Sequence, residues 1–523
     1  MVKKIDLRHN WQESFAALGQ RQVWHMLLLG FSAGLPLLLI FSSLSLWLNE
    51  AGIEKSAITF FSWAALGYSF KFVWAPLVDC VPIPLLTRLL GLRRSWLLVS
   101  QVSIIGAIFL MALSDPAQPN ELVYMALGAV LLGFSSATQD ISIDAYRIEA
   151  VDADMQGLMS ASYIAGYRTG MIVAGAGALY LASYLGTTKA QYYYPAWQYT
   201  YQIMAACMLV GIAATLLIRE PIKRDLEQVH TTAQYFGLLV TFLCCVVVFI
   251  LCYVFTADLA GALQTRLTEL LGSAGLAGLL VGVIRFVFAG AFAVAMARIC
   301  LRFNWVDASL LQTSYVQPIQ RFFDDYGVRT AGLLLALIGL YRISDIVLGV
   351  VSNLFYQDLG FTKIEIADAV KTFGLIMTIF GGFVGGILAM RLGVMRMLFA
   401  GAVLVIVTNL LFIVLFYTGK NTWVMYGVVA ADNLVAGIAS AAFVAFLSSL
   451  VNVQFTAMQY AIFSSLMTLI PKALAGYSGT VVVEFGYDVF FIIAAALGLP
   501  VLVLIYYTHR ALSAQDMPSK PLS

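Results

Sequence analysis

Long apolar stretches alternate with short polar loops along most of this chain. Each stretch holds about the 20 residues that an α-helix needs to cross a bilayer. The pattern predicts an all-α polytopic membrane protein rather than a globular domain with one core. We expect fourteen membrane-spanning helices, at Val23–Leu48, Ser56–Asp79, Ser95–Ser114, Glu121–Arg147, Met155–Leu185, Ala196–Ile218, Tyr235–Ala257, Gly275–Arg298, Thr330–Tyr356, Ile366–Met390, Met395–Tyr417, Thr422–Val451, Phe455–Val483 and Tyr487–Thr508.

The composition agrees with a membrane protein, because 61% of the residues are hydrophobic and 11% are charged, whereas soluble domains carry about 25% charged residues. The net charge of +2 comes from basic residues spread over many loops, so the sequence does not favour a nucleic-acid-binding protein. Six cysteines form no CxxC pair, and the four histidines lie in tails, loops or at a helix edge. We therefore expect no metal site, no cofactor and no enzymatic activity.

Basic residues also orient the helices. If the N-terminus lies in the cytoplasm, nineteen basic residues fall on the inner side and five fall outside, namely Lys55, Lys189, Arg266, Lys363 and Lys420. Cytoplasmic loops are enriched in Lys and Arg, so both termini are predicted to be cytoplasmic. The expected segments are a surface helix at 1–22, a six-helix bundle at 23–219, a linker with two inserted spanning helices and a cytoplasmic loop at 220–329, a second six-helix bundle at 330–508 and a tail at 509–523.

The stretch from Ser135 to Glu149 places charges where a spanning helix should be apolar. Asp140 and Asp144 are four residues apart and Arg147 follows three residues later, so all three share one helix face. A carboxylate at membrane depth costs about 2.5–3.5 kcal/mol on insertion scales, and such residues usually face a pathway or a partner. We interpret the stretch as part of a transport route, although Asp144 and Arg147 could instead lie at the wetted end of the helix.

A loop pattern recurs in the two sets of six helices. APLVDC at Ala75–Cys80 is followed by Gly91, Arg93 and Arg94, and GGILAMRLGVMR runs from Gly385 to Arg396. The second string resembles the G-x-L-a-D-x-x-G-x-R-R loop of the major facilitator superfamily, with Met390 in place of the acidic residue. The resemblance implies two parallel six-helix bundles around a central cavity, with arginines that latch the cytoplasmic side.

More detailed strings resemble the AmpG-type muropeptide permease family, which is itself similar to acetyl-CoA transporters. They are GFSAGLPL at Gly30–Leu37, FKFVWAPLVD at Phe70–Asp79, SATQDISIDAYR at Ser136–Arg147, GYRTG at Gly166–Gly170, YRISD at Tyr341–Asp345, KTFGL at Lys371–Leu375 and DNLVAGIASAAFVAFL at Asp432–Leu447. The inserted pair of helices departs from shorter members. Arg285 within it is interpreted as a local structural contact.

The resemblance implies import of N-acetylglucosaminyl-1,6-anhydro-N-acetylmuramyl peptides from periplasm to cytoplasm, in symport with protons, across the bacterial inner membrane. The expected partners are this cargo, protons and membrane lipid, with no nucleic acid, and we expect a monomer. Moving one charge across 100 mV is worth about 2.3 kcal/mol, so one proton would only cancel the charge of a monoanionic cargo. A cargo closer to neutral through its diaminopimelate amine would need fewer protons.

Such a cargo needs amide and aromatic side chains for its sugars and cations for its carboxylates. The candidates for proton coupling are Asp140, Asp144, Asp345 and Asp432. The candidates for binding cargo are Gln139, Arg168, Lys71, Arg342, Lys371, Asn433, Gln459 and Lys472, with Tyr163, Tyr167 and Trp63 as possible sugar contacts. The candidates for a cytoplasmic gate are Asp79, Arg93, Arg94, Arg147, Arg391 and Arg396.

Other interpretations stay open at this stage. Arg342 and Asp345, or Lys71 and Asp140, could be ion pairs that only hold helices together. The same fold could carry another anionic solute such as a coenzyme A thioester, or could export drugs. A membrane enzyme or a flippase is a further alternative. Small residues at Gly166, Gly170, Ala174, Gly381 and Gly385 are interpreted as helix-packing positions.

Overall fold

The computed structural model describes residues 16–54, 61, 66–118, 120–152, 155–188, 191–221, 231–272, 274–475 and 478–515. These residues are almost entirely helical and include no strand. The predicted surface helix at 1–22 lies mostly outside the described part, and the first long helix begins at Arg21. The tail beyond Gln515 lies outside it as well.

Two compact units divide the chain. The larger unit contains residues 1–78, 82–222 and 322–523, which cover both predicted six-helix bundles apart from residues 79–81. The smaller unit contains residues 79–81 and 223–321, which include the predicted inserted pair.

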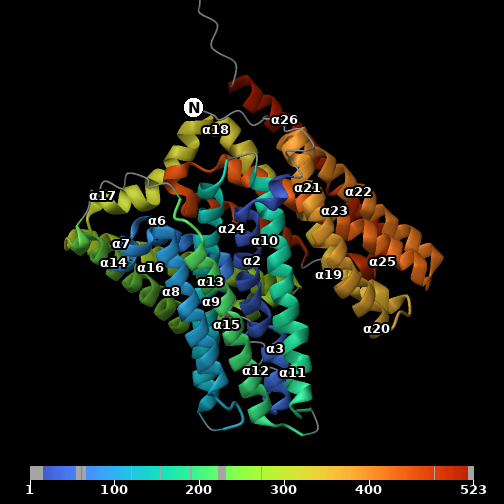
Figure 1. Cartoon of the computed structure of the whole chain (residues 1–523), viewed down its shortest axis with the longest axis horizontal. Coiled ribbons are helices and arrows are strands. Elements are labelled where there is room, and N and C mark those ends of the chain that lie inside the picture. Colours follow the sequence, from blue (N-terminus) through green and yellow to red (C-terminus); the bar gives the residue numbers. More distant parts are fainter. Residues whose placement is uncertain are drawn as a thin grey trace, which may run out of the picture. The chain divides into compact units, whose positions relative to one another are not determined.

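The first half of the larger unit runs from α2 to α13 (Figure 1). Its elements are α2 (Arg21–Ile40), α3 (Ser42–Glu50), α5 (Leu66–Phe70), η3 (Lys71–Val73), α6 (Ala75–Cys80), α7 (Leu86–Leu90), α8 (Leu92–Ala112), α9 (Glu121–Ala150), α10 (Gln156–Ile172), η5 (Val173–Gly177), α11 (Ala178–Tyr184), α12 (Tyr194–Cys207) and α13 (Leu209–Leu217).

The second half runs from α18 to α26. Its elements are α18 (Gln317–Leu340), α19 (Ile343–Asp358), α20 (Lys363–Ile366), η7 (Ala367–Phe373), α21 (Gly374–Leu392), α22 (Val394–Thr418), α23 (Thr422–Leu450), η8 (Val453–Phe455), α24 (Thr456–Ala475), α25 (Ser478–Ala496) and α26 (Leu499–Gln515). The predicted span Thr330–Tyr356 is broken at Tyr341 and Arg342, which form a turn between α18 and α19.

Small residues bring the helices of each half into close contact. A Cβ atom added to Gly34 or to Gly166 would collide with the backbone carbonyl oxygen of Tyr167 or Leu27, so α2 and α10 touch through their main chains. In the second half, Gly381 meets the carbonyl oxygen of Leu434 in the same way. Such close approach is typical of helix packing in membranes, and the predicted packing role of Gly166 and Gly381 is confirmed.

The two halves meet where α10 packs on α21 and α23 and where α9 packs on α24. A Cβ atom on Gly157 would lie 3.3 Å from the carbonyl oxygen of Gly386, so the backbones of α10 and α21 approach closely here. The interface between the halves therefore includes the charged stretch of α9.

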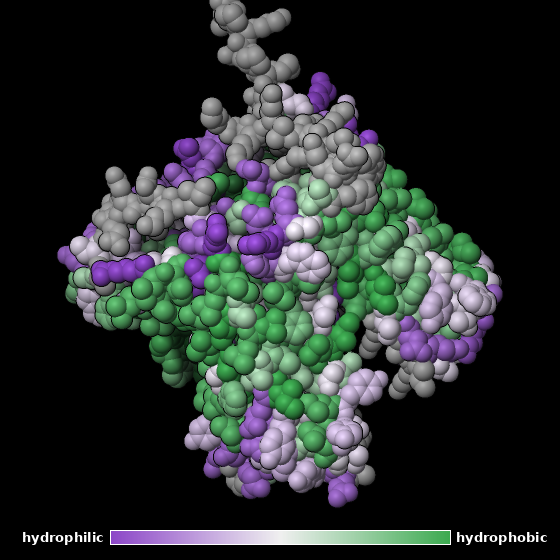
Figure 2. All heavy atoms as spheres, in the orientation of Figure 1, coloured by the Kyte–Doolittle hydropathy of each residue, from purple (hydrophilic) through white to green (hydrophobic). Residues whose placement is uncertain are grey.

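Apolar side chains cover the faces of the helices that have no protein partner. Figure 2 shows hydrophobic residues over the middle of the helices, with hydrophilic residues gathered near the loops. Exposed members include Val102, Phe109, Val123, Leu127 and Val130 on α8 and α9. Contiguous exposed apolar surface of this kind suits contact with lipid tails rather than with water.

Twelve helices among the described residues are long and apolar enough to cross a membrane, so the predicted count of fourteen is not reproduced. Two predicted spans lack a counterpart. Ser56–Asp79 lies partly outside the described residues, and its described part is divided among α5, η3 and α6. Met155–Leu185 is helical, but a π-helical turn interrupts it and glycine, serine and Arg168 dilute its apolar residues.

The smaller unit contains α14 (Thr232–Phe255), α15 (Ala257–Leu271), α16 (Ala274–Arg302), α17 (Ala308–Leu311) and η6 (Gln312–Val316). Within it, α14 and α15 both pack on α16. The short helix α15 was not predicted, because its leucines alternate with polar residues instead of forming an apolar run. Arg285 donates to the carbonyl oxygen of Tyr253 and lies 3.9 Å above its ring centroid, as expected for a local structural contact.

Candidate functional site

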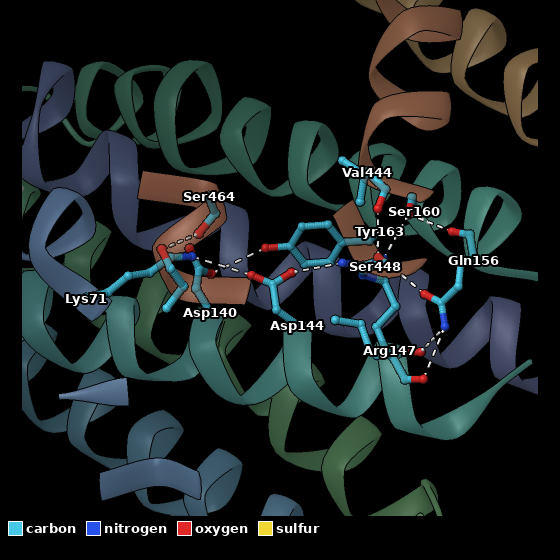
Figure 3. Close-up of polar contacts among 12 residues, drawn as sticks. Lys71, Asp140, Asp144, Arg147, Gln156, Ser160, Tyr163, Val444, Ser448 and Ser464 are labelled. Atoms are coloured by element: carbon cyan, nitrogen blue, oxygen red, sulfur yellow. Dashed lines mark hydrogen bonds and ion pairs between the residues drawn. The ribbon is translucent and has the colours of Figure 1, made fainter. Parts of the chain in front are cut away.

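The charged stretch of α9 meets a lysine from η3 inside the larger unit (Figure 3). The Asp144 carboxylate lies 3.4 Å from the Lys71 ammonium through Oδ2, and 3.4 Å from the Arg147 guanidinium through Oδ1. All three side chains are buried. One carboxylate thus holds two cations, an arrangement that needs further acceptors or a second anion to balance it.

Asp140 supplies the second anion. Its side chain is buried one turn before Asp144 and is close enough to Lys71 to interact electrostatically. The Tyr163 hydroxyl of α10 donates to Asp140 Oδ1 at 3.3 Å. The four charged groups sum to zero when both carboxylates are ionised, so adding one proton leaves an excess positive charge in a buried space.

Arg147 connects the two halves of the larger unit. Its Nη1 atom donates to Ser160 Oγ of α10 at 3.0 Å and to Ser448 Oγ of α23 at 2.8 Å. Its guanidinium also lies 5.1 Å from the ring centroid of Tyr460 on α24. The side chain is fully buried, so the alternative of a wetted helix end does not apply to it.

Gln156 holds the end of α9 in position for these contacts. Its amide oxygen accepts from Arg147 Nη1 at 3.2 Å. Its amide nitrogen donates to the carbonyl oxygens of Arg147 and Ile148, both at 3.2 Å. These carbonyl groups lack partners within the helix, so one side chain both caps α9 and orients the arginine.

Gln139 lies beside Asp140 but turns toward α2. Its amide nitrogen donates to Ser32 Oγ at 3.3 Å, and its buried amide oxygen has no hydrogen-bond partner among the described residues. A buried acceptor without a partner costs free energy. It is therefore a position at which a donor from a bound molecule would be stabilised.

A second charged group lies in the other half, at the break between α18 and α19. Arg342 Nη2 lies 2.7 Å from Asp345 Oδ2, and both side chains are about 30% exposed. The predicted contact between these two residues is thus present. They line a pocket together with Ala436 and Ser440 of α23.

Arg168 and Asp432 lie near that pair. Arg168 of α10 has an exposed side chain that is close enough to both Arg342 and Asp345 to interact electrostatically. Asp432 of α23 is partly buried and interacts electrostatically with Asp345. Neither residue forms a hydrogen bond or an ion pair with the part of the chain that the structure describes.

Two of the predicted gate arginines, Arg93 and Arg94, lie in the first turn of α8. Arg93 Nη2 lies 2.7 Å from Glu149 Oε1, and its Nε donates to Glu149 Oε2 at 3.1 Å. Arg93 also donates to the carbonyl oxygen of Val78 at 3.2 Å. Arg94 donates through its side chain to the carbonyl oxygens of Thr215 and Leu216 at the end of α13. The two arginines therefore join α6, α8, α9 and α13.

Glu220 caps the first turn of α8. Its carboxylate accepts from the backbone N–H groups of Arg93 and Arg94 at 2.8 and 3.1 Å, where the helix dipole favours a negative charge. Gly91 precedes the helix with φ of 92°, and a Cβ atom there would collide with this carboxyl group. Burial raises the pKa of Glu220, although the two backbone donors act in the opposite direction.

The remaining predicted residues are dispersed. Asn433 accepts from Thr378 Oγ1 at 3.0 Å and donates to the carbonyl oxygen of Val429, so it joins α21 to α23. Gln459 is buried and accepts from the backbone of Asn452 at 2.7 Å.

The other gate candidates differ in exposure. Asp79 is buried, Arg391 is partly buried and Arg396 is exposed. Trp63 and the side chains of Lys371 and Lys472 lie outside the described residues.

Several contributors to these networks were not predicted, namely Glu149, Gln156, Ser160, Glu220, Ser448 and Tyr460. Serine and tyrosine are common in spanning helices and carry no distinctive spacing. Glu149 and Gln156 could have been suspected, because they follow Arg147 by two and by nine residues in the chain.

Family models match both halves of the chain. Residues 22–218 match the model described as acetyl-coenzyme A transporter 1, and residues 333–521 match the major facilitator superfamily. A relative named putative transporter AmpG 4, from Rickettsia conorii, is 30% identical over 93% of this chain and 96% of its own length. This chain belongs to the AmpG family. The anhydromuropeptide permease of Escherichia coli K12 is also 30% identical, over 93% of this chain and 79% of its own.

The fold of this AmpG-family protein is that of the major facilitator superfamily. The solved structure of the proton:xylose symporter XylE matches it with a TM-score of 0.56 and 12% identity, over 95% of this chain and 96% of that one. Membership in this family makes the chain a multi-pass inner-membrane transporter and not an enzyme. The expected fold class and the resemblance stated from the sequence are confirmed.

Proposed function

We propose that this transporter imports anhydromuropeptides, the N-acetylglucosaminyl-1,6-anhydro-N-acetylmuramyl peptides, from periplasm to cytoplasm together with protons. The observation that carries the proposal is the combination of a relative named anhydromuropeptide permease with a buried ion pair in the first half of the core and a partly buried one in the second. Sugars and a charged peptide need amide, hydroxyl and charged partners in one pathway. Gln139, Tyr163, Arg168 and Arg342 supply these groups.

Asp140 is the residue we assign to proton coupling. Lys71 and Arg147 compete for Asp144, and Asp140 provides the second negative charge beside Lys71. A proton on Asp140 leaves Lys71 with Asp144 alone, which weakens the hold of Asp144 on Arg147. Because Arg147 also bonds Ser448 of the opposite half, protonation would loosen a contact that has to break when the halves rearrange. Asp144 would then transmit the change.

The gate is proposed to lie on the cytoplasmic side, where the distribution of basic residues predicts both termini. Arg93, Arg94, Arg147, Asp79, Arg391 and Arg396 are its assigned residues. The Arg93–Glu149 pair supports this role, since a buried bidentate contact between helices is costly to break and therefore defines one closed arrangement.

The proposal is tested by uptake of radiolabelled N-acetylglucosaminyl-1,6-anhydro-N-acetylmuramyl tripeptide into proteoliposomes. An inward proton gradient should drive accumulation above the external concentration, and a protonophore should abolish the accumulation while allowing equilibration. Liposomes without protein serve as the control. Uptake that does not depend on the proton gradient would contradict proton coupling. Absence of uptake would contradict the proposed cargo.

A second candidate, transport of a coenzyme A thioester, is favoured by the match of residues 22–218 to the acetyl-coenzyme A transporter model. The same proteoliposomes should be loaded with labelled acetyl-coenzyme A in a parallel series. Efficient transport of the thioester, with excess tripeptide cargo failing to compete, would favour this candidate over the first.

A further inference from the structure

Helix α15 of the smaller unit connects two helices that can span a membrane. Ala233–Phe255 of α14 and Leu280–Arg302 of α16 are both long and apolar enough to cross a bilayer. Only Thr256 separates α14 from α15, and its hydroxyl donates to the carbonyl oxygen of Cys252 at 2.7 Å. At its other end, α15 is separated from α16 by two residues. With so little chain on either side, α15 has to lie close to the membrane surface where the two spans are joined.

Contacts between α14 and α16 show which ends of these helices α15 joins. A Cβ atom on Gly237, near the start of α14, would collide with the carbonyl oxygen of Trp305, just after α16. Near the end of α14, the Arg285 guanidinium of α16 lies 3.9 Å from the ring centroid of Tyr253. The two helices are therefore antiparallel, and α15 joins them at the end opposite to Gly237. In the orientation predicted from basic residues, this end is periplasmic.

One face of α15 packs on α16. Ala260 is buried and Leu267 and Thr268 are half-buried, and these three residues lie on one side of the helix. A Cβ atom on Gly278 of α16 would lie 3.1 Å from Gln264 Nε2, and Gln264 is on this same side of α15. The contact with α16 fixes the rotation of α15 about its axis and therefore determines which residues face outward.

A second face of α15 is apolar and exposed. Leu259, Leu263 and Leu270 are 73%, 39% and 80% exposed, and the helical repeat places them within about 40° of one another. We call these three residues the leucine face. Val254 and Phe255 at the end of α14 are exposed as well. The exposed apolar surface of the span therefore continues onto α15.

A third face of α15 is polar. Asp258, Thr265 and Glu269 are exposed, and a rotation of about 120° separates the centre of this group from the centre of the leucine face. Arg266 is exposed at the border between the two. The packing, apolar and polar residues thus occupy separate sides of a helix of 15 residues.

We propose that α15 is an interfacial helix whose leucine face binds the phospholipid leaflet at the boundary between headgroups and acyl chains. Helices of this kind lie in the plane of the membrane with their apolar face buried about 5–10 Å into that boundary. The lipid surface is the partner that fits, because the leucine face continues the apolar surface of a membrane span. The long side chain of Arg266 can reach a lipid phosphate, and Asp258 and Glu269 face water.

The test measures which residues of α15 contact lipid. Single cysteines are introduced into a variant without native cysteines, labelled with a nitroxide and reconstituted into liposomes of phosphatidylethanolamine and phosphatidylglycerol. Collisions of the nitroxide with oxygen, which concentrates in lipid, are compared with collisions with a neutral nickel chelate, which stays in water. The probes are Leu259→Cys, Leu263→Cys and Leu270→Cys on the leucine face, and Asp258→Cys, Thr265→Cys and Glu269→Cys on the polar face.

Two further positions calibrate the collision rates. Val247→Cys, on an exposed apolar position of α14, gives the value for lipid. Gln118→Cys, in the exposed loop between α8 and α9, gives the value for water. The measurement needs neither cargo nor transport, so its outcome does not depend on the proposed function.

The ratio of oxygen to nickel collisions should be several-fold higher at each leucine position than at each polar position. Six ratios close to that of Gln118→Cys would show that α15 stands in water, and six close to that of Val247→Cys would place it inside the hydrocarbon core. Low collision rates with both reagents at the leucine positions would show that a second copy of this chain or another protein covers them. Each of these three results would overturn the proposal.

A second measurement keeps the label at Leu263→Cys and changes the surrounding face. Leu259→Asn together with Leu270→Asn should lower the oxygen-to-nickel ratio several-fold, because the helix then loses most of its apolar contact with lipid. Asp258→Asn together with Glu269→Gln is the matched control on the polar face and should leave the ratio unchanged. An unchanged ratio in the leucine variant would show that this face does not hold α15 in the membrane surface, against the proposal.

Discussion

Arg147 Nη1 donates to Ser448 Oγ across 2.8 Å, although 301 positions separate the two residues in the chain. The hydrogen bond joins α9 of the first half to α23 of the second. Alternating access requires the halves to move against each other, so this contact has to break and re-form in each cycle. Its strength therefore sets part of the balance between the open and closed arrangements.

Ser448→Ala should shift that balance toward opening at this end. The loss of one acceptor for a buried guanidinium is expected to cost about 1 kcal/mol, since Ser160 and Gln156 still accept from the same nitrogen. This corresponds to about a fivefold change in the population ratio, measured by distance distributions between spin labels on the two halves. Ser449→Ala is the matched control, because its hydroxyl bonds Phe446 within α23. Identical distributions for both variants would mean that the bond does not influence the equilibrium.

Arg342 and Asp345 should be energetically coupled. Neutralising either one leaves a partly buried charge without its partner, so each single variant should lose more transport than the double variant Arg342→Gln, Asp345→Asn. The measurement is a double-mutant cycle on initial uptake at matched expression. The Lys420–Glu365 pair is more exposed, at 45% and 32%, and its cycle should show little coupling. Additive losses in the first cycle would contradict an interaction between Arg342 and Asp345.

Asp140→Asn should abolish accumulation against a gradient while leaving cargo binding within a few-fold of wild type. The amide retains a hydrogen-bond acceptor for Tyr163, but it can no longer take up a proton. Uptake with and without an imposed proton gradient, combined with a binding assay, separates the two effects. Asp368→Asn removes an exposed carboxylate and serves as the control. If Asp140→Asn still concentrates cargo, the residue is structural and Asp345 becomes the better coupling candidate.

Glu220 should make stability depend on pH. Burial raises its pKa above the ordinary value of 4.5, so the folded protein holds this proton more tightly than the unfolded chain does. The stabilisation from the carboxyl group is then greatest below the unfolded pKa and declines as pH rises through the folded pKa. The difference in melting temperature between wild type and Glu220→Gln should therefore shrink from pH 4 upward. A difference that grows with pH would show that the two backbone donors outweigh burial.

The orientation predicted from basic residues can be tested by cysteine labelling in a background without native cysteines. Gln118→Cys, in the exposed loop between α8 and α9, should react with an impermeant reagent in spheroplasts. Arg88→Cys, exposed on α7, should react only after the membrane is opened. Arg93 is unsuitable as a probe because its side chain is buried. Labelling of Arg88→Cys but not of Gln118→Cys in spheroplasts would show that the orientation is opposite to the predicted one.

Most of the fold could be predicted because crossing a bilayer requires long apolar helices that are visible in the sequence. The span around α10 was harder to define, since a helix enclosed by neighbours can carry glycine, serine and arginine. No proline or glycine stands at Tyr341 and Arg342 themselves, and Gly339, two residues before the break, lies within the helix α18. Helix boundaries that depend on tertiary packing were therefore less predictable than the helices themselves.

Charged site residues could be suspected one by one, because each is costly at membrane depth. The pairing of these residues with partners far away in the chain could not be predicted from the sequence. Asp144 meets Lys71, which lies 73 positions earlier in the chain. Tyr460 reaches Arg147 because α9 and α24 pack together, and Ser448 reaches it from α23, which packs on α10. The contacts of Asn433 and Gln459, two predicted cargo-binding residues, with neighbouring backbone and side-chain groups could not be predicted either.

The attachment of Glu220 to the first turn of α8 has a consequence for changes in the length of the chain that follows it. The chain leaves the first half immediately after a residue that two backbone donors hold in place. The end of the first half is thus fixed through α8 and not through Asp140 or Asp144 of α9. Insertions and deletions after Pro221 are therefore expected to disturb these two carboxylates less than changes before Glu220 would.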